Sequence, residues 1–253
     1  KMMQIEFLGT GTSTGVPQIG CKCEVCTSLN IKDNRLRASA LFSVDNKNIL
    51  IDCGPDFRQQ MLRSGIENID AVLITHAHYD HTGGIDDLRP YCAHFPVPIY
   101  LEPEVAGAIR TRLPYCFSDK RYPGIPDLQL IEIDTEPFEI QGIPIIPIRA
   151  MHFKLPVLGF RIGRAAYITD MLTLPESEYN KLKDLDVLII NALRHTEHIS
   201  HQNLKSALQV IERIAPKNAY LTHMSHQMGL HEVESRQLPP NVQFAYDGLI
   251  IKV

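Results

Sequence analysis

Short apolar runs of strand length alternate along this chain with segments of helical pattern. Polar residues bound the runs, which is typical of buried strands in a layered α/β protein. Strand-like runs lie at 4–7, 48–51, 71–74, 143–152, 165–170 and 218–223, and helix-like segments at 56–65, 84–94, 103–112, 175–184 and 202–215. The alternation therefore predicts an α/β fold in which strands and helices form separate layers.

Several of these runs end at a side chain that can bind a metal ion. The run 71–74 is followed by Thr-His-Ala-His-Tyr-Asp-His at 75–81, and three other runs end at His152, Asp170 and His223. Histidine is the commonest metal ligand, carboxylates add oxygen ligands, and sites in α/β proteins lie beyond the carboxyl ends of strands. One such ending could be a capping or turn residue, but four together predict a metal site.

The spacing His-x-His-x-Asp-His at 76–81 resembles the signature of the metallo-β-lactamase superfamily, and the later candidate ligands follow in that family's order. The resemblance covers nearly the whole chain. It implies the α/β, four-layer αβ/βα sandwich of the metallo-β-lactamase fold, with two divalent metals, Zn or Mn, at the active site. The ligands that it implies are His76, His78 and His152 for one metal, Asp80, His81 and His223 for the other, and Asp170 as the bridge.

A dinuclear site of this kind predicts hydrolysis. A divalent ion can lower the pKa of bound water from 15.7 to about 7, and two ions can clamp the attacking and leaving oxygens of a displacement. Cleavage of an ester or a phosphate ester is therefore the expected reaction. The identity of the ions stays open, because histidine and carboxylate ligands accept Zn²⁺, Mn²⁺, Fe²⁺ or Ni²⁺.

A second candidate metal site lies in the cysteine-rich segment 20–26. Cys21, Cys23 and Cys26 can converge on one ion, and tetrahedral zinc commonly takes three cysteines and one histidine. A disulfide among them is the alternative. We find no secretory signal and no long apolar span, so we expect a cytoplasmic protein in a reducing compartment, where a metal site is favoured over a disulfide. The remaining cysteines, at 53, 92 and 116, are expected to be ordinary buried thiols.

The combination of three motifs narrows the resemblance. A Gly-x-Gly-x-Ser start, a Gly-Cys-x-Cys-x-x-Cys loop and a Thr-His-x-x-His segment at 222–226 resemble the PhnP-like cyclic-phosphate phosphodiesterases of the carbon–phosphorus lyase pathway. The resemblance implies that Cys21, Cys23, Cys26 and His226 hold one structural Zn apart from the dinuclear centre. His231 is the rival fourth ligand, and the sequence leaves that choice open.

A third group of histidines, at 194–201, precedes a helix-like segment. The resemblance favours His201 as the catalytic residue that protonates the leaving oxygen or stabilises the transition state, and an unperturbed pKa near 6.5 suits that role. His198 is the alternative acid or a substrate contact, and Asp80 is counted with these two among the catalytic residues. Both histidines could instead be exposed residues near a helix cap. Asp52, after the run 48–51, is expected to orient a ligand histidine.

Composition limits the partners. The chain has 253 residues, 44% of them apolar, and a net charge of −4, whereas a protein that grips RNA should show a basic patch. A basic cluster is formed by Lys32, Arg35 and Arg37, and such a cluster is typical of a solvent-exposed face. We therefore expect a small phosphorylated substrate, no nucleic acid and no membrane.

One domain at 2–253 is expected, with Lys1 set aside as an added residue. The proline-rich stretch 113–127 is predicted to be either a substrate-side loop or a dimer contact. A homodimer therefore stays open.

The leading hypothesis is a metal-dependent hydrolase of the phosphodiesterase type, which cleaves a small cyclic or diester phosphate. The alternatives are a tRNA 3′-processing-type endonuclease, which shares this fold and motif, and a relative of the pyrroloquinoline-quinone-biosynthesis protein, which has the same cysteine-rich loop. A lactone- or ester-hydrolysing relative also remains. The complete set of candidate ligands favours a catalytic centre.

Overall fold

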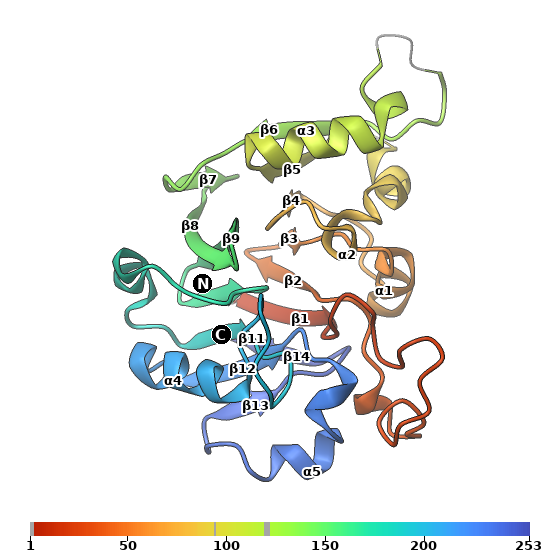
Figure 1. The fold of residues 1–253 in the computed structure, drawn as a ribbon. Coiled ribbons are helices and arrows are strands. Elements are labelled where there is room, and N and C mark those ends of the chain that lie inside the picture. The colour runs from red at the N-terminus through yellow and green to blue at the C-terminus, as the bar shows by residue number, and fades with distance from the viewer. Residues whose placement is uncertain (1–2, 94, 119–121) are drawn as a thin grey trace.

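The computed structural model describes residues 3–93, 95–118 and 122–253, which form two seven-stranded mixed sheets (Figure 1). The first half of the chain builds one sheet and the second half the other, except that the last strand returns to the first sheet beside β1. The first sheet has the order β14-β1-β2-β3-β4-β5-β6 and the second the order β13-β12-β11-β10-β9-β8-β7.

In the first sheet the strands are β1 (Met3–Gly9), β2 (Ser39–Val44), β3 (Lys47–Ile51), β4 (Ala71–Leu73), β5 (Val97–Leu101), β6 (Leu128–Glu132) and β14 (Ile250–Lys252). In the second they are β7 (Phe138–Ile140), β8 (Ile143–His152), β9 (Leu155–Ile162), β10 (Ala165–Ile168), β11 (Val187–Asn191), β12 (Asn218–Thr222) and β13 (Val242–Phe244).

The two sheets pack face to face through a shared apolar core. Phe7 and Phe42 from the first sheet meet Phe160 and Tyr167 from the second in one buried cluster. Because side chains alternate across a strand, the same strands present a second apolar face outwards, and helices must cover it.

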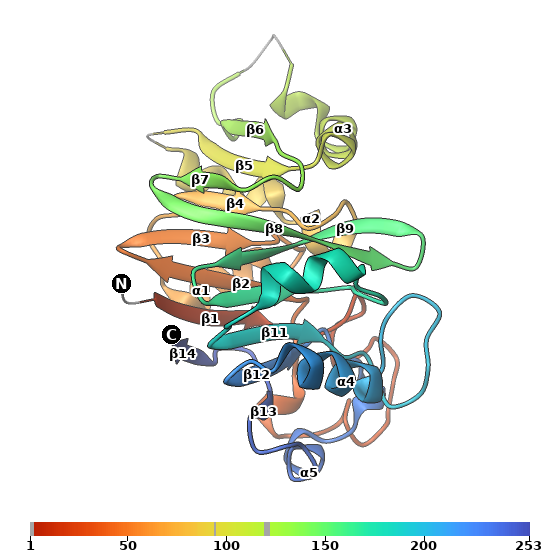
Figure 2. The same cartoon turned by 90° about the vertical axis from the view of Figure 1, so that its left-hand side faces the viewer.

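Helices α1 (Phe57–Ser64) and α3 (Pro103–Arg112) cover the outer face of the first sheet, and α4 (Leu204–Ile214) covers that of the second. Figure 2 shows α4 lying over the second sheet. These four layers confirm the αβ/βα sandwich expected from the sequence.

The helix-like segments at 56–65, 103–112 and 202–215 became α1, α3 and α4, but the segments 84–94 and 175–184 form 3₁₀ helices instead, η2 (Ile85–Cys92) and η4 (Glu176–Leu182). Pro90 inside η2 has no N–H for an α-helical hydrogen bond. The remaining short helices are α2 (Tyr79–Thr82), α5 (His231–Ser235), η1 (Ile31–Asp33), η3 (Pro114–Cys116) and η5 (His226–Met228).

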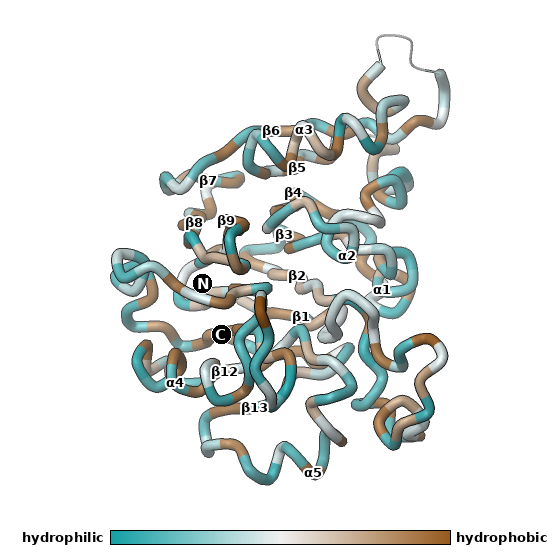
Figure 3. The backbone as a smooth tube through the Cα atoms, in the orientation of Figure 1, coloured by the Kyte–Doolittle hydropathy of each residue, from teal (hydrophilic) through white to brown (hydrophobic). Residues whose placement is uncertain are grey.

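Apolar and polar positions alternate along the described chain in Figure 3. No helix among the described residues has the length and apolar character needed to cross a bilayer. The proline-rich stretch 113–127 includes residues 119–121, which lie outside the described residues together with His94. Its roles as a substrate-side loop or dimer contact therefore stay predictions.

Candidate metal sites

The ends of strands from both sheets bring the predicted histidines and aspartates together. His76 and His78 follow β4, and His78 is the N-cap of α2, whose first turn carries Asp80 and His81. The remaining three follow or end strands of the second sheet: His152, Asp170 and His223. The N–H of Leu158 on β9 donates to the carbonyl oxygen of Thr75 (3.0 Å), which ties the strand end of the first sheet to the second.

Three of the strand-end residues have left-handed backbone. The φ angles are 62° at Asp52, 54° at Asp170 and 59° at His223. A non-glycine residue in this region costs about 1–3 kcal/mol, and such conformations cluster at functional sites. The surrounding fold therefore holds these side chains in place at an energetic cost to itself.

The first cluster consists of Asp80, His81, Asp170 and His223, whose candidate ligand atoms all lie within 4.8 Å of one another. His81 Nε2 is 2.8 Å from Asp170 Oδ2 and 3.1 Å from Asp80 Oδ2, and His223 Nε2 is 3.2 Å from Asp170 Oδ2. Despite these short distances, His81 Nε2 and both ring nitrogens of His223 are buried without a hydrogen-bond partner among the described residues. Once deprotonated, imidazole nitrogens at these positions and the two carboxylates form a donor set that suits a shared divalent cation.

The second cluster is built around His76, His78 and His152. His76 Nε2 lies 3.0 Å from His78 Nδ1, and the ring centroids of His78 and His152 are 5.3 Å apart. His201 joins them, because its candidate ligand atom lies within 4.8 Å of those of His152 and Asp170. The sequence had given His201 a role in protonating the leaving group, and its position also suits a metal ligand.

Hydrogen bonds from outside the clusters orient the rings. Asp52 Oδ2 accepts from His81 Nδ1 (2.6 Å), which confirms the orienting contact expected of Asp52. His152 Nδ1 donates to the carbonyl oxygen of Ser200 (2.8 Å), so Nε2 of His152 is left free to bind an ion. The hydroxyl of Thr75 lies 2.9 Å from both Asp52 Oδ2 and His76 Nδ1.

Sequence reasoning missed the contributions of Thr75 and Ser200. For Thr75, its position directly before the histidine motif is a weak sequence signal. Ser200 contributes through its backbone carbonyl oxygen, which every residue has, so the sequence carries no signal for it.

The carboxylates control the charge of the first cluster. Burial favours a neutral His81, but the carboxylates of Asp170, Asp80 and Asp52 outweigh it and raise the pKa of His81 well above its usual value. Burial alone would raise the pKa of Asp170, yet the neighbouring rings of His223 and His81 hold it well below the usual range. The protein therefore surrounds this point with negative charge that a cation must balance.

The pKa of His201 shifts in the opposite direction from that of His81. Burial first, and then the nearby ring of His223, lower the pKa of His201 to about 3. The unperturbed pKa that the sequence suggested for this residue was wrong, since its side chain is only 11% exposed beside other imidazoles. His201 is a neutral ring in the free protein at neutral pH.

Two chain segments touch closely behind the histidine motif. A Cβ atom at Gly54 would overlap the carbonyl oxygen of Asp80, and one at Gly84 would overlap the carbonyl oxygen of Gly54. Only glycine lets the loop after β3 and the segment around α2 approach this closely. That approach brings Asp52 to His81.

The cysteine-rich loop forms a separate cluster with His226. His226 Nδ1 lies 3.2 Å from Cys23 Sγ and 3.7 Å from Cys21 Sγ, and Cys26 completes a group with all ligand atoms within 4.8 Å. Tetrahedral zinc with ordinary Zn–S and Zn–N bonds separates sulfur from nitrogen by about 3.6 Å. The four side chains therefore have the spacing of a closed zinc site.

The other candidate histidine lies elsewhere. His231 Nδ1 is 3.2 Å from a guanidinium nitrogen of Arg35, and His231 belongs to none of the ligand clusters found in the described residues. Arg35 itself is buried, so the expectation that it lies on a solvated face was wrong; it donates to the hydroxyl of Thr10 (2.8 Å) and to the carbonyl oxygen of Ala245 (2.7 Å).

All six cysteines are free thiols. A hydrogen bond from the Cys26 N–H is the main cause that lowers the pKa of Cys23, to about 6, whereas burial raises the pKa of Cys26 to about 11. The disulfide alternative for this loop is not what the structure contains.

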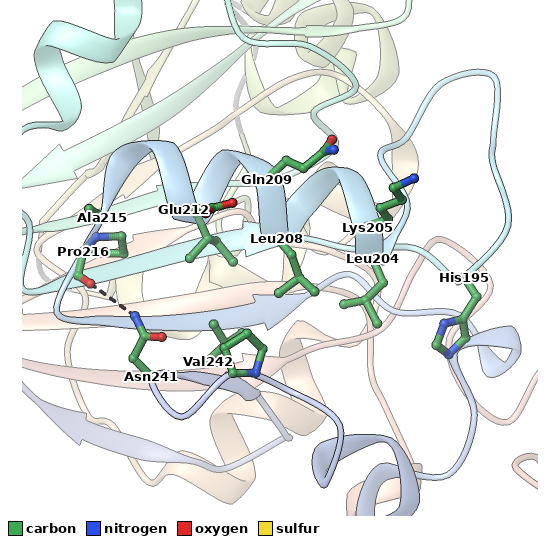
Figure 4. A pocket seen from close by; sticks show the side chains of 12 residues that line it. His195, Leu204, Lys205, Leu208, Gln209, Glu212, Ala215, Pro216, Asn241 and Val242 are labelled. Atoms are coloured by element: carbon green, nitrogen blue, oxygen red, sulfur yellow. Dashed lines mark hydrogen bonds between the residues drawn. The ribbon is translucent and has the colours of Figure 1, made fainter.

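Two hollows lie near the histidine-rich loop 194–201. A groove of about 800 Å³ runs along α4 and is lined by Leu204, Leu208 and Val242 among others, and His195 lies on its wall (Figure 4). A smaller hollow of about 230 Å³ adjoins His201 and His198. Only the smaller one touches the metal clusters, through His201.

Comparisons with known proteins agree with this geometry. A solved structure described as a new diphosphatase from the PhnP family is 37% identical, covers 100% of this chain and 98% of that chain, and superposes with a TM-score of 0.94. The octanoyltransferase of Porphyromonas gingivalis (strain ATCC BAA-308 / W83) is 46% identical over 250 residues, which are 98% of this chain and 51% of the relative. The chain thus spans about half the length of that relative.

A more distant relative covers the full length of both chains. The coenzyme PQQ synthesis protein B of Acinetobacter baylyi (strain ATCC 33305 / BD413 / ADP1) is 22% identical, over 99% of this chain and 100% of the relative. The family profile described as the beta-lactamase superfamily domain matches residues 47–224, which include all seven histidines and aspartates of the two strand-end clusters. This chain belongs to the beta-lactamase superfamily and, within it, to the PhnP family.

Proposed function

We propose that this hydrolase cleaves a small cyclic or diester phosphate, with divalent ions held between the two sheets. The observation that carries the proposal is the convergence of seven histidines and aspartates at the strand ends, six of them buried and His78 exposed. His81 and His223 have buried ring nitrogens that lack a hydrogen-bond partner among the described residues. The 37% identity to a PhnP-family diphosphatase over the whole chain supports a phosphorus-containing substrate.

The proposed ligands form two sets that share one carboxylate. His76, His78 and His152 would hold one ion, Asp80, His81 and His223 the other, with Asp170 between them. Zn²⁺ or Mn²⁺ suits such a mixture of imidazole and carboxylate. When bound, the ions supply Lewis acidity and neutralise phosphate charge.

The chain's own residues prepare the site for that chemistry. Asp52 accepts the Nδ1 proton of His81 and so fixes which nitrogen faces the ion, and the carbonyl oxygen of Ser200 does the same for His152. Because these ligands are oriented before substrate arrives, little reorganisation accompanies the reaction.

We assign His201 to the leaving oxygen of the substrate. Its buried neutral ring can donate one N–H hydrogen bond, which would stabilise negative charge that develops on that oxygen. Phosphate charge nearby also favours protonation of the ring. His198, one turn of the loop away, is assigned a substrate contact.

Cys21, Cys23, Cys26 and His226 are proposed to hold a structural Zn with four protein ligands. Their loop and the segment that carries His223 would then be fixed to each other, since His226 is three residues beyond His223. The binding free energy of such an ion contributes directly to folding.

Diphosphate cleavage is the second candidate, because the PhnP-family structure at 37% identity is named a diphosphatase. Both reactions displace an oxygen from a phosphorus atom, so one centre can serve either. Octanoyl transfer is the named activity of a relative whose length this chain covers by 51%, and we do not assign it to this half.

A turnover screen on the metal-loaded protein tests the proposal. The substrates are ribose cyclic phosphates, 2′,3′-cyclic nucleotides, bis(p-nitrophenyl) phosphate, a nucleoside diphosphate sugar, a lactone and a precursor tRNA. We expect cyclic phosphates to be turned over fastest. Turnover of the lactone or the tRNA alone would contradict the phosphodiesterase assignment, and turnover of the diphosphate alone would favour the second candidate.

A further inference from the structure

The groove along α4 is a feature of the outer surface that the proposed function does not use. It has a volume of about 800 Å³ and runs between α4 and the segment 239–242 at the start of β13, the edge strand of the second sheet. Leu204 and Leu208 are only half-buried and point from α4 toward Val242 on the opposite wall (Figure 4). Apolar side chains gathered in a surface hollow of this kind mark an interaction site.

The spacing of the lining residues and the size of the groove suit a helix as occupant. Four apolar lining positions of α4 follow one another at steps of four, three and four residues: Leu204, Leu208, Ile211 and Ala215. That is the spacing of a seam along which one helix packs against another. A helix of the length of α4, 11 residues, is about 16 Å long and occupies roughly 1,300 Å³ at a diameter of about 10 Å. The groove can therefore enclose more than half of such a helix.

The charges beside this seam identify the partner helix as α4 of a second copy. Lys205 and Glu212 are exposed, line the groove and form no ion pair within the described part of the chain. They lie about 10 Å apart along the helix axis, too far to pair with each other. In an antiparallel pair of α4 helices, Leu208 of each copy packs against Ile211 of the other. In the same register, Lys205 of each copy faces Glu212 of the other, so two ion pairs form at once.

We propose that two copies of this chain associate through α4, with the helices antiparallel about a two-fold axis and each helix lying in the other's groove. The axis passes beside Gln209, which is exposed in the groove. Its amide both donates and accepts, so it can meet its own copy without repulsion. Such an interface is isologous and closes with two copies. This inference goes beyond the proposed function and does not depend on which ester is cleaved.

The contact is expected to be weak, because three helical turns from each copy make a smaller interface than the roughly 1,200–2,000 Å² of stable complexes. We therefore expect a monomer–dimer equilibrium with Kd between about 1 μM and 1 mM. Sedimentation velocity of the whole metal-loaded chain at low ionic strength, measured over a series of concentrations, gives this constant.

Charge reversal tests the antiparallel register. Lys205→Glu and Glu212→Lys each turn two attractive pairs into two repulsive ones, so each should raise Kd about five- to thirtyfold. The double variant Lys205→Glu/Glu212→Lys restores both pairs with their signs exchanged, and its Kd should return to within about threefold of the original. Both side chains are exposed, so the fold should be kept. The matched control is Lys252→Glu, which makes the same charge change at an exposed position on β14 of the first sheet.

Rescue by the double variant, with an unchanged Kd in Lys252→Glu, would support the α4 interface. A chain that stays monomeric at about 1 mM would overturn the proposal. So would a dimer whose Kd does not respond to either single reversal, because its interface would lie elsewhere. A double variant that associates no better than the single variants would overturn it as well, since Lys205 and Glu212 would then not face each other across the axis.

Discussion

The two candidate metal sites differ in what holds them. The histidine and aspartate clusters sit at the ends of strands in two packed sheets, and oriented rings such as His81 and His152 have hydrogen-bond partners outside the cluster. The cysteine cluster sits on loops, and its three cysteines belong to a small apolar cluster whose only other buried members in the described residues are Val16 and Val25. The comparison indicates that the packed sheets position the histidine and aspartate ligands. An ion bound by the cysteine cluster would instead stabilise the surrounding loops.

The segment between β1 and β2 supports this contrast. Residues 10–38 contain no α-helix and only the 3₁₀ helix Ile31–Asp33. Buried Arg35 anchors the end of the segment near β2 through Thr10 and the carbonyl oxygen of Ala245. The cysteine cluster is the corresponding anchor for the rest of the segment. Metal removal should therefore affect the two sites in different ways.

The largest effect is expected from Asp170→Asn. Replacement removes the charge that both proposed ion sites share but keeps a residue type that tolerates left-handed backbone. The rate of hydrolysis should fall by more than about a hundredfold. That is the largest loss typical for residues that only support metal ligands, and Asp170 is proposed to be a ligand itself. The melting temperature should move little. Steady-state kinetics and thermal unfolding measure both.

Asp184→Asn is the matched control, because Asp184 is exposed and also has left-handed backbone, with φ 56°. It should leave activity unchanged. Equal losses in the two variants would mean that the backbone conformation, and not the shared carboxylate, is responsible.

The second effect concerns stability. Cys23→Ser should remove one bound Zn per chain and lower the free energy of unfolding by about 3 kcal/mol, or roughly 10 °C in melting temperature. At low temperature, activity per folded molecule should stay within about threefold of the original, since the other site is held by the sheets. Metal analysis and calorimetry are the measurements.

Cys92→Ser is the control for the chemical change. Cys92 is a half-buried thiol outside the cluster, 3.5 Å from the carbonyl oxygen of Leu88. It should keep the Zn and most of the stability. A Cys23→Ser protein with unchanged metal content and melting temperature would remove the structural role.

A third prediction concerns pH. The carboxylates around His81 outweigh its burial and raise its pKa, so the ring is charged in the metal-free protein at neutral pH. A ligand histidine must be neutral, so metal binding releases that proton. Affinity should therefore rise about tenfold per pH unit below the pKa of His81 and level off above it.

Calorimetric titration of the metal-free Cys23→Ser protein isolates this effect, because that variant lacks the cysteine site. In an added Asp52→Asn substitution, one of the carboxylates that raise the pKa is gone. The pH dependence should then level off at a lower pH. An identical profile with and without Asp52 would contradict the assigned role of this carboxylate.

The strand-end residues could be predicted from the sequence because each one closes a local apolar run. His152, Asp170 and His223 are such cases, and the structure places their side chains beside the motif at 76–81. Local periodicity was less informative about the segments that connect the strands. It predicted a helix at 84–94, but Pro90 and its neighbours form a 3₁₀ helix.

Interactions between distant parts of the chain could not be predicted in this way. Arg35 reads as part of a basic surface cluster, but its partners Ala245 and His231 are far along the chain and bury it. The low pKa of His201 has the same origin, because burial by several elements decides it. Neither effect has a pattern in the neighbouring residues.

The smallest predicted effect tests whether the fold orients the histidine cluster through hydrogen bonds. The Thr75 hydroxyl lies 2.9 Å from both Asp52 Oδ2 and His76 Nδ1. Thr75→Val keeps the shape and removes this link, so metal affinity should fall about tenfold, the lower end for such supporting groups. Thr222→Val is the matched control, since the buried hydroxyl of Thr222 has no hydrogen-bond partner among the described residues. Removing an unpaired buried hydroxyl should leave affinity unchanged and raise stability slightly. If both variants lost affinity equally, the cause would be altered packing at the strand ends and not the loss of the Thr75 hydrogen bonds. The difference between the two metal sites would then not depend on these hydrogen bonds.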